Sequence, residues 1–160
     1  MPSRVYSLTQ PEASESKTVV TGQLSSAGTM LTVLFDSGAT HSFVSTRMLD
    51  GLCRPSTELD RAVHIILPRG DRVVARRGIR ALPVTVEGRE LHVNVMELEI
   101  DDFDFILGMD TLAKYGANID CKRRTVTFSP EGEEPFVFVG SMFISRVPRI
   151  SALKAKEFLN

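Results

Sequence analysis

An apolar segment that ends in a carboxylate turn constrains the fold of this chain more than any other feature. Residues 30–35 are rich in β-forming side chains and lead directly into Asp36-Ser37-Gly38-Ala39. Such a segment is typical of a strand that delivers one carboxylate into a tight turn, where Gly38 lets the backbone bend and lets another chain approach closely. Aspartate and glycine are also common in ordinary turns, so this motif alone does not decide the function.

The single copy of this motif has a chemical consequence. Hydrolysis of a peptide bond by acid–base chemistry of this kind needs two facing carboxylates that share a proton. The chain supplies one such carboxylate, Asp36. The sequence therefore predicts half of an active site, which a second identical chain would complete.

Composition narrows the classes of partner. The chain has 160 residues, 42% of them hydrophobic, which is enough for one domain with a core. Its 19 basic and 20 acidic residues nearly cancel, so no overall charge recruits nucleic acid or membrane. The sequence shows no apolar run of transmembrane length and no signal peptide, so we expect a cytoplasmic protein. Its two cysteines, Cys53 and Cys121, are far apart in sequence, and we expect them to be free thiols.

Short β-rich segments separated by turn signals predict a mostly β domain over residues 18–130. We expect residues 1–17 to be a flexible lead-in and residues 131–160 to be a C-terminal extension, and the pattern leaves open whether 129–160 fold with the domain. The expected strands are 19–21, 31–35, 62–67, 72–75, 81–86, 91–98, 103–107, 118–121, 125–128 and 136–144. The expected short helices are 43–52, 109–115 and 151–159.

A second motif strengthens the first. Ile106-Leu107-Gly108 ends an apolar strand, precedes a short helix and begins 70 positions after Asp36 (106 minus 36). This pair of motifs, with a hairpin between them, resembles the retropepsins, the single-domain aspartic proteases of retroviruses and retrotransposons. In that family the apolar-apolar-Gly unit packs behind the catalytic loop, where glycine is needed because backbones come close.

Three segments resemble one group within this family more specifically. Residues 34–45 look like the catalytic segment of plant Gypsy-type LTR retrotransposon proteases, and residues 106–128 resemble the segment that closes the same domain. Residues 150–156 are similar to the linker toward reverse transcriptase. The resemblance implies an all-β closed barrel with one or two short helices, in which each subunit of a homodimer forms half of the acid-protease fold. It also implies cleavage of a Gag–Pol polyprotein in the context of a virus-like particle.

The resemblance assigns roles around the carboxylate turn. Asp36 is expected to be the catalytic residue, and Ser37 and Gly38 to support the loop, with Ser37 contacting the partner loop. Ala39 is expected to line the backbone of an extended peptide substrate. Behind the loop, the resemblance implies that Ile106, Leu107 and Gly108 form its backing.

The resemblance implies that the hairpin over residues 63–75 takes the position of the flap that closes over substrate. Its residues Ile65, Ile66 and Leu67 are expected to wall the substrate pockets.

Two features depart from the retroviral pattern. Thr40 and Met109 stand where an internal Asp–Arg ion pair is found, and the flap tip reads Pro68-Arg69-Gly70 without a glycine-rich run.

Other readings concern charged and polar clusters. Acidic residues around 97–104 lack the ligand pattern of a calcium loop, so we expect a solvated turn, no metal and no cofactor. Asp110 is expected to cap the following helix. His41 is expected to pack or hydrogen-bond locally after the turn, the alternative being that it tunes the carboxylate pair or contacts substrate. His64 and His92 are given no chemistry. The arginines of residues 69–80 have no interleaved aromatics, which makes direct nucleic-acid binding an unfavoured alternative. The competing function is a catalytically silent dimerisation or peptide-binding module with the same fold.

Overall fold

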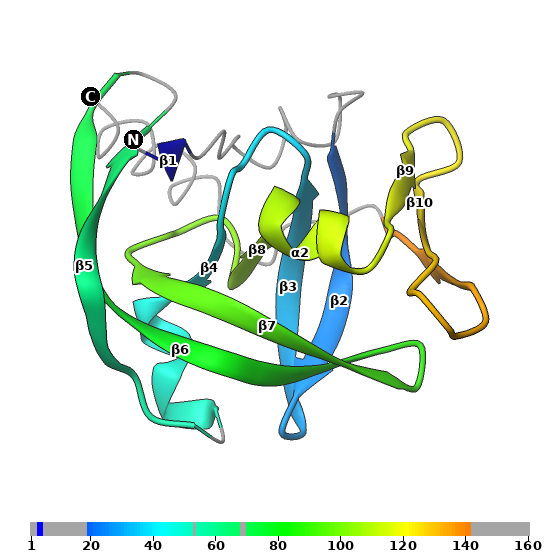
Figure 1. Cartoon of the computed structure of the whole chain (residues 1–160), viewed down its shortest axis with the longest axis horizontal. Coiled ribbons are helices and arrows are strands. Elements are labelled where there is room, and N and C mark those ends of the chain that lie inside the picture. Colours follow the sequence, from blue (N-terminus) through cyan, green and yellow to red (C-terminus); the bar gives the residue numbers. More distant parts are fainter. Residues whose placement is uncertain (1–2, 5–18, 53, 68–69, 142–160) are drawn as a thin grey trace.

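The chain forms short strands because β-branched and aromatic residues alternate with polar ones between glycine-containing turns. The structure is a computed structural model that describes residues 3–4, 19–52, 54–67 and 70–141. In this part of the chain it is mostly β, with a short α-helix and one 3₁₀ helix, as predicted (Figure 1). The larger sheet contains β1 (Ser3–Arg4), β2 (Val19–Ser26), β3 (Thr29–Asp36), β4 (Ser42–Ser45), β5 (Thr57–Ile66), β6 (Arg72–Val86), β7 (Arg89–Leu98) and β8 (Phe105–Leu107). The remaining elements are η1 (Thr46–Gly51), α2 (Met109–Lys114), β9 (Asn118–Asp120), β10 (Thr125–Phe128) and β11 (Phe136–Val139).

The larger sheet closes on itself. Its strand order is β1-β5-β6-β2-β3-β8-β4-β7, and an additional pairing joins β6 to β7. The strands β6, β2, β3, β8, β4 and β7 therefore form a ring, while β5 and β1 extend from one side of it (Figure 1). This arrangement confirms the closed barrel expected from the sequence.

The first hairpin places the carboxylate motif. β2 and β3 pair antiparallel, with Val19 opposite Asp36 and Ser26 opposite Thr29. The connecting turn uses Ala27 and Gly28, both at positive φ. This confirms the predicted hairpin, and it puts Asp36 at the end of a strand that is paired on both edges.

One long strand replaces two predicted ones. β6 runs unbroken through residues 72–86, although the sequence predicts separate strands at 72–75 and 81–86. Its first part pairs with β5 and its second part with β7, with an irregularity between Ile79 and Leu82. The stretch 76–80 between the two predicted strands holds three arginines and Gly78. Here the strand passes from one partner to the other, since Gly78 pairs with both Thr57 of β5 and Met96 of β7.

The predicted helix over residues 43–52 is wrong in its first part. Residues 42–45 form β4, which is fully buried and pairs parallel with β7 and antiparallel with β8. The 3₁₀ helix η1 follows only from Thr46. A β-rich segment such as Phe43-Val44 becomes a strand here because it has neighbours on both sides, which local sequence cannot reveal.

The packed structure continues past residue 130. β11 pairs with β10, and β10 pairs with β9, to form a separate three-stranded sheet. On β11, Phe138 is 4% exposed, and its ring lies 4.8 Å from that of Phe35 on β3. Residues 136–141 thus fold with the barrel, whereas the helix predicted at 151–159 and most of the lead-in 1–17 lie outside the described residues.

Buried apolar side chains form two clusters. The larger fills the barrel and includes Phe35, Phe105 and Phe128. The second lies under the β5–β6 hairpin and includes Leu34, Ala39 and Ile106 from the segments around Asp36, which makes it part of the candidate site. Among the described residues, no helix is long and apolar enough to cross a membrane.

Candidate active site

Asp36 lies at the carboxyl end of β3 and is 1% exposed. The backbone N–H of Gly38 donates to its Oδ1 at 2.8 Å, and the N–H of Ala39 donates to the Asp36 carbonyl oxygen at 3.2 Å. These two bonds hold the tight turn that the motif predicts. The other carboxylate oxygen, Oδ2, is buried and has no hydrogen-bond partner.

The environment of this carboxylate changes its acidity. Burial raises the pKa of Asp36 from 3.8 to about 6, against the opposing effect of the N–H groups of Gly38 and Ala39. An acid with a pKa in this range can hold or release a proton at mildly acidic pH. The geometry therefore gives one carboxyl group the property that general acid–base chemistry requires.

β8 backs the turn from behind. It pairs parallel with β3, with Ile106 opposite Leu34 and Leu107 opposite Phe35, and it pairs antiparallel with β4. Gly108, which follows it, is buried so closely against the loop that a Cβ there would collide with the backbone of His41. The structure thus brings Ile106, Leu107 and Gly108 together behind the turn.

Asp110 joins the loop to helix α2, a contact that the sequence reasoning missed. Its Oδ1 accepts hydrogen bonds from Ser42 Oγ at 2.7 Å and from the Thr111 N–H at 2.8 Å. Ser42 Oγ in turn accepts from the Gly108 N–H at 3.0 Å. Asp110 thus lies in the first turn of α2 and ties the helix to β4. It is not the cap expected from the sequence, because the N-cap residue is Gly108. The sequence departs from the retroviral ion pair at Thr40 and Met109, and it contains no signal that Asp110 and Ser42 form a contact in this region instead.

Asp104 corrects the expectation of a solvated acidic turn. It forms a 2.8 Å ion pair with Arg47, and its Oδ2 accepts from the Thr32 N–H at 2.8 Å. Asp102 nearby is also buried. The acidic segment therefore contains a structural anchor between β3 and η1, and the described residues contain no group of three or more potential metal ligands.

The β5–β6 hairpin covers the same cluster. Ile65 and Leu67 are buried and share a hydrophobic cluster with Ala39 and Ile106. Side chains alternate along a strand, so Ile66 lies on the opposite face from Ile65. Of the three residues expected to wall the substrate pockets, the structure brings Ile65 and Leu67 to the inner face and leaves Ile66 outside it.

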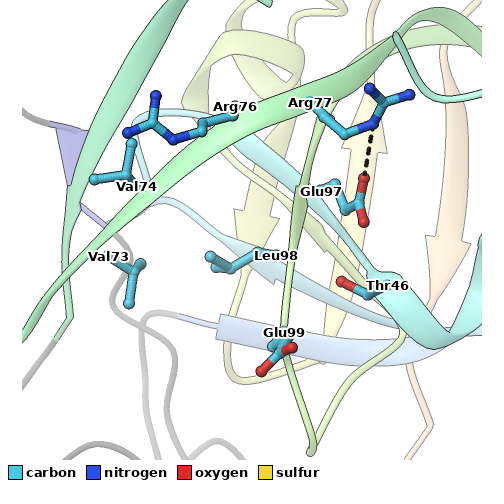
Figure 2. A pocket seen from close by; sticks show the side chains of 8 residues that line it. All are labelled: Thr46, Val73, Val74, Arg76, Arg77, Glu97, Leu98 and Glu99. Carbon is cyan, nitrogen blue, oxygen red and sulfur yellow. Dashed lines mark ion pairs between the residues drawn. The ribbon is translucent and has the colours of Figure 1, made fainter. Parts of the chain in front are cut away.

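A hollow of about 330 Å³ lies beside this hairpin (Figure 2). Its lining residues come from η1, β6 and the end of β7 and its following residue: Thr46, Val73, Val74, Arg76, Arg77, Glu97, Leu98 and Glu99. Arg77 and Glu97 form an ion pair with a separation of 3.9 Å, and Arg77 also donates to the Ser56 carbonyl oxygen. Arginines of this stretch thus pair with acidic side chains, as Arg80 does with Asp60 at 2.8 Å.

A closed β-barrel in which one strand delivers a carboxylate into a glycine turn, with a second strand and glycine packed behind it, defines a retropepsin-like fold. The chain belongs to the retroviral aspartyl protease family, whose model matches residues 1–134.

Two solved structures are similar to this chain. The retroviral protease-like domain of Ddi1 from Leishmania major has 21% identity and a TM-score of 0.51, and the match covers 69% of this chain and 84% of that one. EIAV protease in complex with the inhibitor HBY-793 has 23% identity and a TM-score of 0.49, covering 62% of this chain and 89% of that one. At these identities the Ddi1 likeness supports the fold alone. No curated protein matches this chain.

Proposed function

We propose that the chain is a homodimeric aspartic endopeptidase in which two copies of Asp36 form the catalytic pair. The observation that carries this function is the buried carboxylate whose Oδ2 lacks any hydrogen-bond partner. A buried unpaired carboxylate oxygen is costly, and a second carboxyl group that shares a proton with it would satisfy it. Membership of the aspartyl protease family supports this assignment.

The mechanism follows from the pairing. Two carboxyl groups a few ångströms apart cannot both ionise easily, so the pair holds one proton at mildly acidic pH. The ionised Asp36 takes a proton from a bound water, and the resulting nucleophile attacks the scissile carbonyl carbon. The protonated Asp36 of the partner subunit donates to the carbonyl oxygen and then helps the amine to leave.

The neighbouring residues have supporting roles. Ser37 contacts the loop of the partner subunit, and Gly38 lets the substrate backbone approach. Ala39 lines the substrate, and the β5–β6 hairpin moves as a flap with Ile65 and Leu67 on its inner face. An extended peptide gains main-chain hydrogen bonds from such a groove, and alternate side chains enter its pockets.

The substrate class comes from the retrotransposon resemblance of residues 34–45 and 106–128. We propose that the chain cleaves the polyprotein in which it is made, inside a virus-like particle. The expected partners are therefore a second copy of the chain and an extended polyprotein segment.

One observation favours the alternative of a silent peptide-binding or dimerisation module. Asp36 is 1% exposed, and a carboxylate that water cannot reach performs no hydrolysis. An endopeptidase must therefore expose Asp36 before it binds substrate. The two functions differ in turnover, because both permit peptide binding.

The test is cleavage of a pool of polyprotein-derived peptides at pH ~5, between the usual limits for such carboxyl pairs. Wild type, Asp36→Asn and the control Asp50→Asn, which removes an exposed carboxylate, are compared with and without a statine-type inhibitor. Cleavage that is lost only in Asp36→Asn and blocked by the inhibitor supports the endopeptidase. A folded, dimeric wild type that binds peptides without cleaving them establishes the module instead.

A further inference from the structure

Asp71 occupies the tip of the β5–β6 hairpin. The Leu67 N–H donates to the Asp71 carbonyl oxygen at 2.8 Å, and the Gly70 N–H donates to the Leu67 carbonyl oxygen at 2.8 Å. The antiparallel ladder, which pairs Ile66 with Arg72, thus continues one residue further. Because residues opposite each other on antiparallel strands point to the same face, the Asp71 side chain lies on the face of Leu67.

That face is the one turned toward the candidate active site. Leu67 and Ile65 are buried in the cluster that contains Ala39, three residues after Asp36. Arg72, the next residue along β6, is exposed on the other face. The hairpin therefore directs a carboxylate, and not its neighbouring guanidinium, toward the apolar cluster beside Asp36.

The carboxylate of Asp71 is incompletely satisfied. Its Oδ2 is buried and has no hydrogen-bond partner, and within the described part of the chain Asp36 alone shares this property. Leaving such an oxygen without a donor costs about 1–3 kcal/mol, so an unpaired oxygen in a native protein calls for an explanation, and a bound ligand is one. A donor that arrives with a ligand would remove this cost.

We propose that Asp71 determines specificity by accepting hydrogen bonds from a lysine or arginine side chain of the bound peptide, close to the scissile bond. A charged donor fits better than a neutral amide because a hydrogen bond from a cation to a carboxylate is stronger. Val73, which is partly buried on the same face, offers apolar surface to the methylene stem of such a side chain. This role requires a bound peptide and so rests on the peptidase function proposed for Asp36.

The experiment uses the best-cleaved peptide of the pool or, where none is cleaved, the peptide that the Asp36→Asn chain binds most tightly. This peptide is resynthesised with lysine, arginine, norleucine or glutamate at each of its central positions in turn. Wild type, Asp71→Asn and Asp71→Arg are compared by kcat/KM. Asp60→Asn is the matched control, because it removes an exposed carboxylate from the same hairpin. Binding of fluorescein-labelled forms of the same peptides to the Asp36→Asn chain, with and without Asp71→Asn, gives a readout that does not need turnover.

We expect wild type to prefer lysine or arginine over norleucine at one position, and Asp71→Asn to reduce this preference about tenfold, the effect of one hydrogen bond to a charged group. Asp71→Arg should shift the preference toward glutamate, and Asp60→Asn should leave it unchanged.

Equal losses of kcat/KM for all four peptides would overturn the inference and leave Asp71 a structural residue. If no peptide is cleaved but the binding preference follows Asp71, the specificity role stands and the peptidase function fails. Absence of both cleavage and binding refutes the two together.

Discussion

Asp36 combines two conditions that oppose each other. Its backbone is fixed by the turn bonds to Gly38 and Ala39, while its carboxyl group is removed from water beside apolar residues. Burial disfavours the charged form, so the fold destabilises the ionised state of the residue on which the proposed chemistry depends. A measurable trade between stability and activity follows.

The substitution Asp36→Asn should stabilise the fold at neutral pH and abolish cleavage. Because the pKa of Asp36 rises from 3.8 to about 6 on folding, the native state holds its proton over that window while the unfolded state loses it. Its contribution to the free energy of unfolding is therefore fully present below pH 3.8 and falls as pH rises to about 6, by up to about 3 kcal/mol. Urea unfolding at pH 3.5 and pH 7.5 should show a gain for Asp36→Asn only at the higher pH. An equal gain at both values would mean that the ionised carboxylate is not destabilising.

At the scale of elements, helix α2 and strand β4 are joined through Asp110. Ser42 donates to Asp110 from the strand, and Gly108 donates to Ser42 from the start of the helix. These bonds hold Ser42, which follows the carboxylate turn, against Gly108 and the first turn of α2. They connect the two sequence motifs that are far apart along the chain.

Replacing Asp110 with alanine removes the acceptor for Ser42 and for the Thr111 N–H. We expect a loss of about 1.5–3 kcal/mol in the free energy of unfolding, the usual contribution of a hydrogen bond to a charged group, because Ser42 loses its bond to the carboxylate. Asp101→Ala is the control, because it removes an exposed carboxylate from a nearby turn. Equal stabilities of the two variants in urea would show that the Asp110 contacts add nothing to the fold.

Strand β11 is the second element with a specific consequence. Phe138 packs against Phe35, the residue that precedes Asp36, while Val139 is 66% exposed. Phe138→Ala should cost about 3–5 kcal/mol, as expected for truncating a buried aromatic side chain, and Val139→Ala less than about 1 kcal/mol. Thermal unfolding of both variants measures the difference. Similar values would mean that β11 is not part of the cooperative unit.

At the scale of the whole molecule, one chain presents one Asp36 and the proposed reaction needs two. A mixture of wild type with Asp36→Asn separates the possibilities. Random pairing of equal amounts, at constant total concentration above the dimer dissociation constant, should leave about one quarter of the wild-type rate, because mixed dimers lack a complete pair. A rate of one half would indicate that each chain acts alone. Sedimentation at the assay concentration establishes that the chains are dimeric.

The sequence by itself determined the local parts of this protein. The β-rich texture, the hairpin that carries Asp36, the short helix after Gly108 and the relation between the two motifs all follow from residue type and spacing. Each depends on interactions within a few residues, or on a pattern shared across a family. For the same reason, the resemblance by itself indicates a retropepsin-like barrel.

Tertiary structure decided what depends on distant neighbours. The segment 42–45 is a strand and not a helix because β7 and β8 flank it, and β6 is continuous because it exchanges one partner for another. The unpaired oxygens of Asp36 and Asp71 are likewise properties of packing, since burial arises from residues remote in sequence. Sequence specifies which groups can do chemistry, and only the folded arrangement fixes which of them lose water and which still need a partner.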